Sequence, residues 1–347
     1  MIVKDANELR ESVKRVLLAA GADEENAHLV AVHLVKADLS GVQTHGILQV
    51  AKYVEWIEKG YIDPAGRPHI IDDHPTWAKV DGGATFGHVA ADYATRLAIE
   101  KAKEQTIAMV GIVHVNHIGR LGHFSEIAAA EGMISLIWDG GINHISPRAA
   151  PFGGCERILD VDPIAIGIPA GDRDPVIVDF ATTSGSAVKV DNAQRRGRML
   201  PPGTIVDKLG RPSIDPRDYF EGGALAPFGG HKGYALMLAT QFLGRVLTGA
   251  DNHIRNGEVL PEMRHQGVTI IVIRADAFGP MDEFCGRVDE TLNRLTTSRP
   301  GEGFGSVRYA GQIESTRRAE GEDSGIPYLD DVWQMFADAA KSVGVAV

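Results

Sequence analysis

The chain has little cysteine: its 347 residues contain only Cys155 and Cys285, and no CxxC pair occurs. Two cysteines cannot form a disulfide framework, and without CxxC they give no reason to expect structural zinc. Positive charge is also in the minority, because 46 acidic residues against 35 basic ones give a formal charge of −11. This balance argues against nucleic acid or an anionic membrane as the main partner.

Long apolar runs are missing too. No stretch reaches the ~18 apolar residues of a membrane span, and the opening MIVKDANELRESVKRVLLAAG has no apolar signal core. The sequence therefore predicts a cytoplasmic globular protein. Several nucleotide-binding and hydrolase motifs are also absent, namely GxGxxG at a strand-to-helix turn, the Walker loop, HExxH and GxSxG. If the protein binds a dinucleotide, it does so without the Rossmann fingerprint.

Apolar periodicity indicates an α/β protein with two parts. Helical spacing is found around 9–17, 24–38 and 50–57, and again around 88–102, 124–131, 232–247, 281–295 and 328–342. Short β-branched runs at 107–115, 134–138, 164–168, 176–178 and 268–273 predict strands. Only some strands alternate with helices, so a mixed sheet is expected. We expect residues 1–75 to form a helical lobe on which 280–347 packs. Residues 76–279 would form a nicotinamide-binding and substrate lobe, with an irregular excursion at 195–223.

The segment Gly41–Ile47 is the first candidate site. Thr44 is well placed to cap the helix that follows, which puts His45 at a helix amino terminus, where the exposed N–H groups favour an anion and disfavour imidazolium. A bound carboxylate would pull the ring back toward its charged form, which suits a general acid. The alternative is that Thr44 is only a cap and His45 only a surface residue.

Three histidines, His114, His117 and His123, lie within ten residues after a predicted strand. Their number suggests a metal site. On a strand, however, His114 and His117 point to opposite faces and could share an ion only if the chain turned between them. The glycines of this segment favour instead a loop that bends over a ligand, with Asn116 or His117 as hydrogen-bond donors. A solvated loop is the third interpretation.

Two further segments could bind a dinucleotide. A predicted strand ends in Asp179 and continues through Ala181, Thr182 and Thr183, a pattern that could bind ribose and phosphates or simply form a turn that caps the next helix. A glycine-rich stretch then leads through Lys232 and Gly233 into an apolar helix, which makes a plausible anion site.

Taken together, these segments resemble the malate/L-lactate dehydrogenase family of the non-Rossmann type, which includes L-sulfolactate dehydrogenase and piperideine-2-carboxylate reductase. The likeness runs nearly end to end, in the same order as in the family. It covers THG with its YVEWIEKGYIDP continuation, NHIGRLGHF, PFGG, DPIAIGIP, VDFATTSG, LPPGTIVDKLGRPSIDP, GGALAPFGGHKGYAL, AGQIESTRR and GIPYLDDVW.

The resemblance implies an L-sulfolactate dehydrogenase-like fold, with a mixed, mostly antiparallel sheet lobe beside a helical lobe built from both chain ends. It also implies a homodimer with each active site near the subunit boundary, and NAD or NADP as cofactor. His45, with Thr44 in place of the family serine, matches the usual proton donor, and His117 matches a substrate-contacting histidine that takes this role in some members. The positions implied for the dinucleotide are Asp179, Ala181, Thr182, Thr183, Lys232, Gly233, Gly311 and Gln312.

The chain departs from the family pattern at three places. Many members carry arginine four residues after the SHG histidine, suited to a bidentate carboxylate contact, and here that residue is Gln49. Asp162 replaces the asparagine of NPIA, and the usual PGE is Ala310-Gly311-Gln312. Another arginine, such as Arg120, Arg148 or one in the 195–198 run, would then hold the substrate carboxylate. Alternatively, the substrate is a less acidic carbonyl or an imine.

The reaction implied by the resemblance is hydride transfer between the nicotinamide and a small 2-oxo or 2-hydroxy acid, with His45 or His117 moving the proton. Thr44, Gln49, Asn116, Arg120 and Arg148 are the residues expected at the carboxylate substrate. Three alternatives stay open: an NAD(P)H-dependent reductase of a cyclic imino acid, a metal hydrolase built on the three clustered histidines, and a non-catalytic ligand-binding protein. The sequence does not choose between NAD and NADP.

Overall fold

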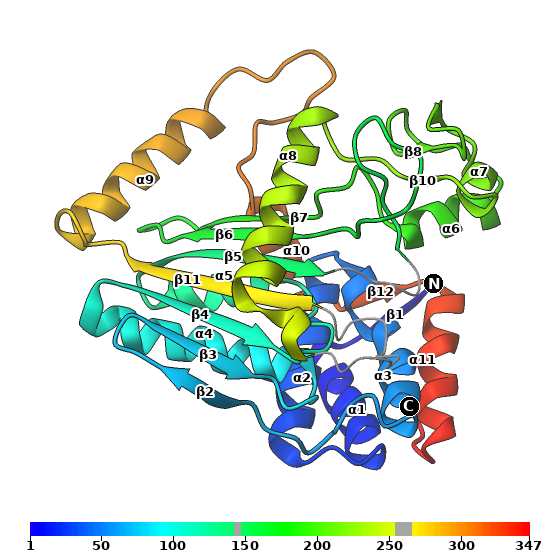
Figure 1. Cartoon of the computed structure of the whole chain (residues 1–347), viewed down its shortest axis with the longest axis horizontal. Helices are drawn as coiled ribbons and strands as arrows, with labels where there is room; N and C mark the ends of the chain where they lie inside the picture. Colours follow the sequence, from blue (N-terminus) through cyan, green and yellow to red (C-terminus); the bar gives the residue numbers. More distant parts are fainter. Residues whose placement is uncertain (142–146, 254–265) are drawn as a thin grey trace.

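The computed structural model describes residues 1–141, 147–253 and 266–347. Both chain ends contribute to one helical layer, in which the first helices pack on the last one (Figure 1). Its elements are β1 (Ile2–Lys4), α1 (Ala6–Ala19), α2 (Glu24–Leu39), α3 (Val50–Glu58), α10 (Gln312–Ser324), β12 (Ile326–Tyr328) and α11 (Asp330–Ser342). β1 pairs with β12, which ties the two ends together. The three amino-terminal helices predicted from apolar spacing are confirmed.

A seven-stranded sheet forms the second layer, in the order β2-β3-β4-β11-β5-β6-β7. Its strands are β2 (His69–Asp73), β3 (Trp77–Asp81), β4 (Ile107–Val113), β5 (Met133–Gly141), β6 (Ile164–Ile168), β7 (Val176–Phe180) and β11 (Gln266–Arg274). All neighbours are antiparallel except β3 and β4, which are parallel. The expected mixed, mostly antiparallel sheet is therefore confirmed, with no doubly wound parallel core.

Helices cover both faces of this sheet. α4 (Gly87–Gln105) and α5 (Gly122–Ala130) pack on one face and share an apolar core with the strands. α8 (His231–Thr240) and the π-helical turn Gln241–Val246 that continues it cross the other face (Figure 1). The close approach there depends on glycine, because a Cβ on Gly244 would overlap the backbone of Gly140 in β5.

A third, smaller core lies beyond the sheet, under residues predicted to be irregular. The segment 195–223 and its flanks form α6 (Ala187–Arg195), β8 (Ile205–Val206), β9 (Pro212–Ser213), α7 (Pro216–Phe220) and β10 (Ala224–Leu225). The three short strands pair with one another and cover buried Ile205, Tyr219 and Leu225. Most of 195–223 has no regular secondary structure, as expected, but these short elements build a core that the sequence did not predict.

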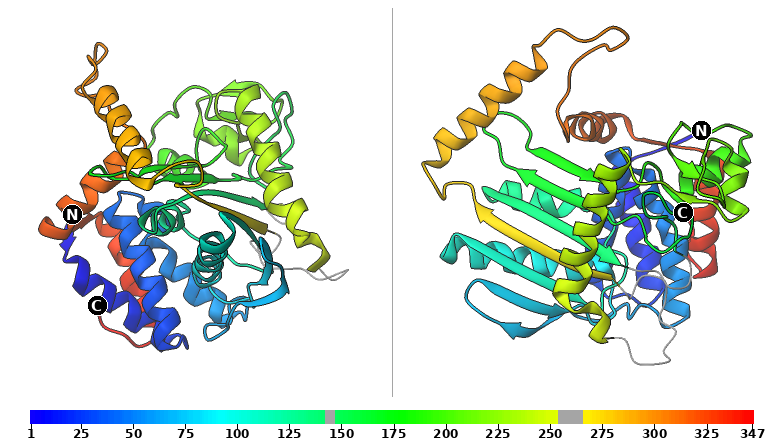
Figure 2. Two further views of the ribbon diagram at one scale, coloured as in Figure 1. Left: turned by 90° about the vertical axis from the view of Figure 1, so that its left-hand side faces the viewer. Right: turned by 45° about the horizontal axis from the view of Figure 1, so that its top comes forward.

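The carboxyl-terminal segment divides between two places. α10, β12 and α11 lie with the amino-terminal helices, but α9 (Met281–Thr296) extends from the far end of the sheet (Figures 1 and 2). It is anchored by Asp289, whose carboxylate accepts the backbone N–H of Asp172 at 2.7 Å. The expectation that all of 280–347 packs on the helical lobe is thus incorrect for α9. The boundary at residue 75 stays a prediction.

In the described residues, every helix is too short or too polar to cross a bilayer.

Candidate functional site

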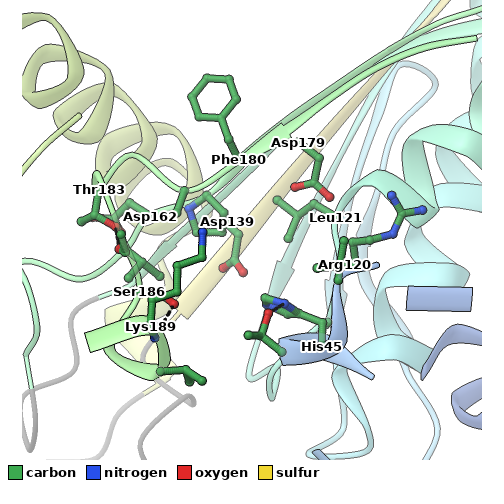
Figure 3. A pocket seen from close by; sticks show the side chains of 18 of the residues that line it. His45, Arg120, Leu121, Asp139, Asp162, Asp179, Phe180, Thr183, Ser186 and Lys189 are labelled. Atoms are coloured by element: carbon green, nitrogen blue, oxygen red, sulfur yellow. Dashed lines mark hydrogen bonds between the residues drawn. The ribbon is translucent and has the colours of Figure 1, made fainter. Parts of the chain in front are cut away.

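A cavity of about 810 Å³ lies where the helical layer, the sheet and the small third core meet (Figure 3). Its wall is built from parts of the chain that are far apart in sequence. They are the segment after α2, the loop after β4, the end of β5, the 160–163 turn, the end of β7 with the start of α6, and residues 309–314. This volume is within the range of small-molecule and cofactor sites.

His45 and His117 lie next to each other on this wall. Their ring centroids are 5.5 Å apart, and the ring planes are inclined by 25°. His45 is in the 3-10 turn Gln43–His45, and His117 is in the loop between β4 and α5. The structure thus brings the two predicted imidazoles to one cavity.

Both rings are held near neutrality by their surroundings. Burial, followed by the positive charges of Arg120 and Lys52, lowers the pKa of His45 to about 4. Burial also sets the pKa of His117 well below its ordinary value, and His45 and Lys52 add to the effect. A carboxylate bound beside them would favour the imidazolium form and raise these pKa values. Binding of a substrate carboxylate would therefore favour protonation of the pair, as expected of a proton donor.

The orientation of His117 is set by Tyr53 of α3. The phenol oxygen of Tyr53 lies 2.7 Å from Nδ1 of His117 and 3.5 Å from Nε2 of His88. His88 and His33 form a buried layer under the loop, and Nε2 of His33 accepts the backbone N–H of Arg120 at 2.9 Å. With Nδ1 occupied by the phenol, Nε2 of His117 is the nitrogen left for the cavity.

Thr44 was expected to cap a helix, and this was wrong. Residues 43–45 and 47–49 form two 3-10 turns, and α3 begins only at Val50. The Thr44 hydroxyl lies 3.0 Å from Nδ1 of His45, and its carbonyl accepts the Gln49 side-chain amide at 2.7 Å. Both residues line the cavity, so their predicted place at the substrate is compatible with the structure.

The turn that carries His45 is supported from below by Asp38 of α2. One oxygen of this buried carboxyl accepts the Ile47 N–H at 2.9 Å and the Tyr328 hydroxyl at 2.7 Å. Burial raises the pKa of Asp38 to about 7. A Cβ on Gly46 would overlap this carboxyl, so glycine is required after His45.

Arg120 is the buried cation of the wall, and only 3% of its side chain is exposed. Its guanidinium donates to Glu126 at 2.6 Å, and Glu126 also pairs with Lys36 and Arg318. Of this group, Arg120 is the member that lines the cavity, and it lies beside the Asp179 carboxyl. Arg148, the second predicted arginine, lines the cavity and pairs with Asp160 at 3.2 Å.

Asn116, by contrast, was wrongly assigned to the substrate. Its side-chain amide is buried and donates to the carbonyls of Ala84 and Thr85, both at 2.9 Å. It therefore fastens the loop to the turn before α4, and it is not part of the cavity wall.

The predicted dinucleotide residues divide into two groups. Asp179, Ala181, Thr183 and Gly311 line the cavity. Asp179 accepts the Gly122 N–H at 2.7 Å, at the amino terminus of α5, and burial raises its pKa. Thr183 donates to the Gly185 carbonyl, so the 179–186 segment is both a turn and part of the wall. Gly311 has φ +93° and lies against Ile177, where a Cβ would be only 3.0 Å from its backbone nitrogen.

Four other predicted positions lie outside the wall. The Thr182 hydroxyl is turned inward and donates to the Val161 carbonyl at 3.0 Å. Gly233 is buried beneath Phe228, Lys232 is exposed at the start of α8, and Gln312 begins α10. The Thr182 hydroxyl is therefore not directed to the cavity, and the role of Thr182 at the dinucleotide stays a prediction. Gln312 directly follows Gly311 of the wall, and the roles of Lys232 and Gly233 stay predictions.

Sequence reasoning missed several residues that face the cavity. Asp139 at the end of β5, Ser186 and Lys189 of α6 and Glu314 of α10 all line it. Figure 3 shows Lys189 and Asp139 pointing into the same space as His45. Asp139 directly follows the apolar run 134–138, which predicted a strand, and it belongs to no recognisable motif.

The three clustered histidines have separate environments. His114 pairs with Asp81 at 3.1 Å, His117 with Tyr53, and His123 packs on His33 at a centroid distance of 4.4 Å. Within the described residues, no three histidine, cysteine or acidic side chains are grouped as they would be around a metal ion.

The polar groups of the wall suit a dinucleotide. A carboxylate and a threonine at the end of β7 face the cavity next to the amino terminus of α6, where Ser186 caps the helix and Lys189 supplies a positive charge. Carboxylates bind ribose hydroxyls, and a helix amino terminus with a cation binds phosphate. These residues therefore fit a bound NAD or NADP.

Comparison with known proteins agrees with this geometry. The family model described as malate/L-lactate dehydrogenase matches residues 4–337. The chain is 34% identical to a malate dehydrogenase of Pyrococcus abyssi, over 98% of the chain and 94% of that protein. It is 36% identical to the L-sulfolactate dehydrogenase of Methanocaldococcus jannaschii, over 100% and 98%.

The solved structures extend the comparison. The structure of a sulfolactate dehydrogenase from Methanocaldococcus jannaschii superimposes with a TM-score of 0.88, over 99% of this chain and 98% of that one, at 32% identity. A delta1-piperideine-2-carboxylate reductase from Pseudomonas syringae superimposes with a TM-score of 0.85, over 98% and 100%, at 27% identity.

Proposed function

The chain belongs to the malate/L-lactate dehydrogenase family and is an oxidoreductase of 2-hydroxy acids. We propose that it uses NAD or NADP as cofactor and that His45 and His117 move the proton. The observation that carries this proposal is the stacking of the two imidazoles, 5.5 Å apart, on the wall of a cavity that also contains Asp179 and Thr183. The substrate is a small carboxylate.

The bound nicotinamide would supply the hydride and hence the redox chemistry. The protein holds the substrate carbonyl near the histidine pair, and Nε2 of one ring donates a proton to the oxygen as the alcohol forms. In the reverse direction the same nitrogen accepts that proton. A positioned acid of this kind contributes about 10²–10⁴ to the rate.

The substrate carboxylate binds at the Arg120 end of the cavity, beside Thr44 and Gln49. Gln49 cannot form the bidentate, charge-assisted contact of an arginine. Arg120 supplies the positive charge instead, because it lines the cavity and shares the Glu126 carboxylate with Lys36 and Arg318.

The dinucleotide lies along the part of the wall where Asp179, Ala181, Thr183 and Gly311 face the cavity. Thr182 and Gly233 act through the backbone they shape, and Lys232 and Gln312 border the outer part of the site.

The active form is a homodimer. Three large apolar side chains, Phe242, Val246 and Leu247, are each more than half exposed on the outer side of the helix that crosses the sheet. α9 likewise extends from the body of the subunit (Figure 2). Apolar surface gathered in this way marks a protein interface, and a second copy of the chain is the occupant we propose.

The test is an absorbance screen at 340 nm of small 2-oxo acids and cyclic imines, each with NADH and with NADPH. We expect oxidation of one cofactor with at least one 2-oxo acid or imine, and activity that survives EDTA. Cofactor binding without turnover of any compound would instead indicate a ligand-binding protein.

A further inference from the structure

A buried histidine of α2 contacts the loop that carries His117 and Arg120, and it has no role in the proposed reaction. His33 is fully buried, and its Nε2 accepts the backbone N–H of Arg120 at 2.9 Å. Arg120 is one of the residues that line the cavity. Figure 3 shows it on the same side of the cavity as His45. His33 thus lies directly behind a residue proposed to bind the substrate.

This hydrogen bond fixes the chemical state of His33. A backbone N–H can only donate, so Nε2 of the ring must accept, and the proton of the neutral ring must lie on Nδ1. Burial, followed by the neighbouring His123 and His88, holds the pKa of His33 well below its ordinary value. The ring therefore stays neutral near pH 7 and keeps the lone pair that receives the Arg120 N–H.

The loop packs closely on this imidazole at Gly119, the residue before Arg120. Gly119 has φ +76°, and a Cβ there would overlap Nε2 of His33 and Nε2 of His88. The two rings contact each other, with their centroids 4.5 Å apart. The backbone of Gly119 and Arg120 therefore rests on two buried rings, and a change of side chain at position 33 acts first on this backbone.

Packing alone does not account for a histidine at position 33. Nδ1 of His33 is buried and has no hydrogen-bond partner in the part of the chain that the structure describes. An unpaired buried N–H group destabilises a fold, and an apolar ring in the same place would not carry that cost. What histidine offers here, and phenylalanine does not, is the acceptor for the Arg120 N–H.

The side chain of Arg120 is held at its other end by Glu126. Its guanidinium donates to that carboxylate at 2.6 Å, while its Nε is buried with no hydrogen-bond partner among residues 1–141, 147–253 and 266–347. His33 fixes the backbone and Glu126 fixes one nitrogen, so the remaining N–H groups are held in one orientation. A carboxylate contact of the planar guanidinium depends on such an orientation.

We propose that His33 is a positioning residue of the substrate carboxylate site, which fixes the backbone at Arg120 and so holds the guanidinium in the orientation that pairs with the carboxylate. This inference rests on the proposed function and adds to it a residue behind the cavity wall. His33 acts on substrate binding, whereas Tyr53 acts on His117.

Binding of oxamate, an analogue of a 2-oxo acid, provides the first test. Titration calorimetry on the full chain with saturating NADH or NADPH should show at least tenfold weaker binding in His33→Phe, which keeps a ring but has no acceptor. The dissociation constant of the dinucleotide should change less than threefold. His33→Gln, whose Oε1 can take the place of Nε2, should bind oxamate within threefold of the wild type.

The matched control is His123→Phe. The His123 ring packs on His33 in the same buried layer, at a centroid distance of 4.4 Å. A general loosening of this layer would weaken oxamate binding in His123→Phe as well, whereas the proposal expects the wild-type affinity. Should His33→Phe fail to fold, His33→Asn replaces it, because its shorter amide does not reach the Arg120 N–H.

A double-mutant cycle tests whether His33 acts through Arg120. Arg120→Gln alone should weaken oxamate binding at least tenfold, and His33→Phe added to it should weaken binding less than twofold further. In kinetics, His33→Phe should raise KM for a 2-oxo acid at least tenfold and change kcat less than threefold.

Several results would overturn the proposal. They are wild-type affinity in the variant that lacks the acceptor, an equal loss in His123→Phe, no recovery in His33→Gln, multiplying effects in the double mutant, or a fall in kcat as large as the rise in KM. If the wild type binds no oxamate and reduces no 2-oxo acid, the proposed function itself fails. If it does both and the His33 variants behave like it, this inference alone fails.

Discussion

The phenol oxygen of Tyr53 lies 2.7 Å from Nδ1 of His117. Burial raises the pKa of Tyr53, so the phenol keeps its proton and can donate it to the ring. A histidine whose Nδ1 accepts a hydrogen bond carries its own proton on Nε2. α3 therefore fixes the orientation of the His117 ring, with Nδ1 toward Tyr53 and Nε2 left for the cavity.

Removing this hydrogen bond should impair turnover more than binding. For Tyr53→Phe we expect kcat to fall roughly ten- to hundredfold, as for other hydrogen bonds that orient a functional histidine. The dissociation constant of the dinucleotide, measured by fluorescence titration, should change little. Tyr219→Phe, a buried tyrosine of the small third core, is the control and should keep kcat. A Tyr53→Phe enzyme with normal kcat would contradict the positioning role.

Substituting each histidine in turn should show which one transfers the proton. Loss of the proton donor should lower kcat for a 2-oxo acid by about 10²–10⁴. We expect this loss in either His45→Ala or His117→Ala and a smaller one in the other, measured at 340 nm with saturating cofactor. Normal turnover in both variants would show that the pair is not the acid.

Carboxylate binding should be coupled to proton uptake. Burial lowers the pKa of His45 to about 4, so the ring is neutral at pH 6 to 7. A bound carboxylate raises that pKa, the complex takes up a proton, and affinity rises as pH falls. Calorimetry with oxamate at pH 6, in buffers of different ionisation enthalpy, should detect this uptake. It should be smaller in His45→Asn; proton release on binding would be the opposite of what we expect.

Glu126 should be important for stability because three cations surround it. The charges of Lys36, Arg120 and Arg318 lower the pKa of this buried carboxylate to about 2, against the effect of burial. Removing one member of such a buried group leaves the others uncompensated and costs about 3–5 kcal/mol. Glu126→Gln should lower the free energy of unfolding by about that amount in urea denaturation. Glu100→Gln, which loses an exposed ion pair with Lys103, should change it little.

The apolar patch on the helix that crosses the sheet predicts the oligomeric state. Light scattering should give twice the chain mass of 37.3 kDa. Val246→Asp, in the centre of the patch, should shift the protein to a monomer. Leu209→Asp, at an exposed apolar residue beside the small third core, should leave the dimer intact. A wild-type monomer at micromolar concentration would exclude the proposed homodimer.

Local patterns in the sequence were enough to predict most of the large elements. α1, α2 and α3 have apolar residues at helical spacing, and the central strands are rich in β-branched residues. α10 was missed because its sequence, QIESTRRAEGEDS, has almost no apolar face. β8, β9 and β10 were missed because two residues are too few to show a period of two. The small third core that they form therefore appeared only in the structure.

The sequence by itself determined the family, the mixed sheet and the two histidine segments, because these depend on residue types and on their order along the chain. Only the tertiary structure decided that His45 and His117 stack, that Asn116 faces the protein interior and Asp139 the cavity, and that Arg120 shares Glu126 with two other cations. The direction of a side chain and the pairing between distant segments depend on how the lobes pack. The spacing of residues within one segment does not determine that packing.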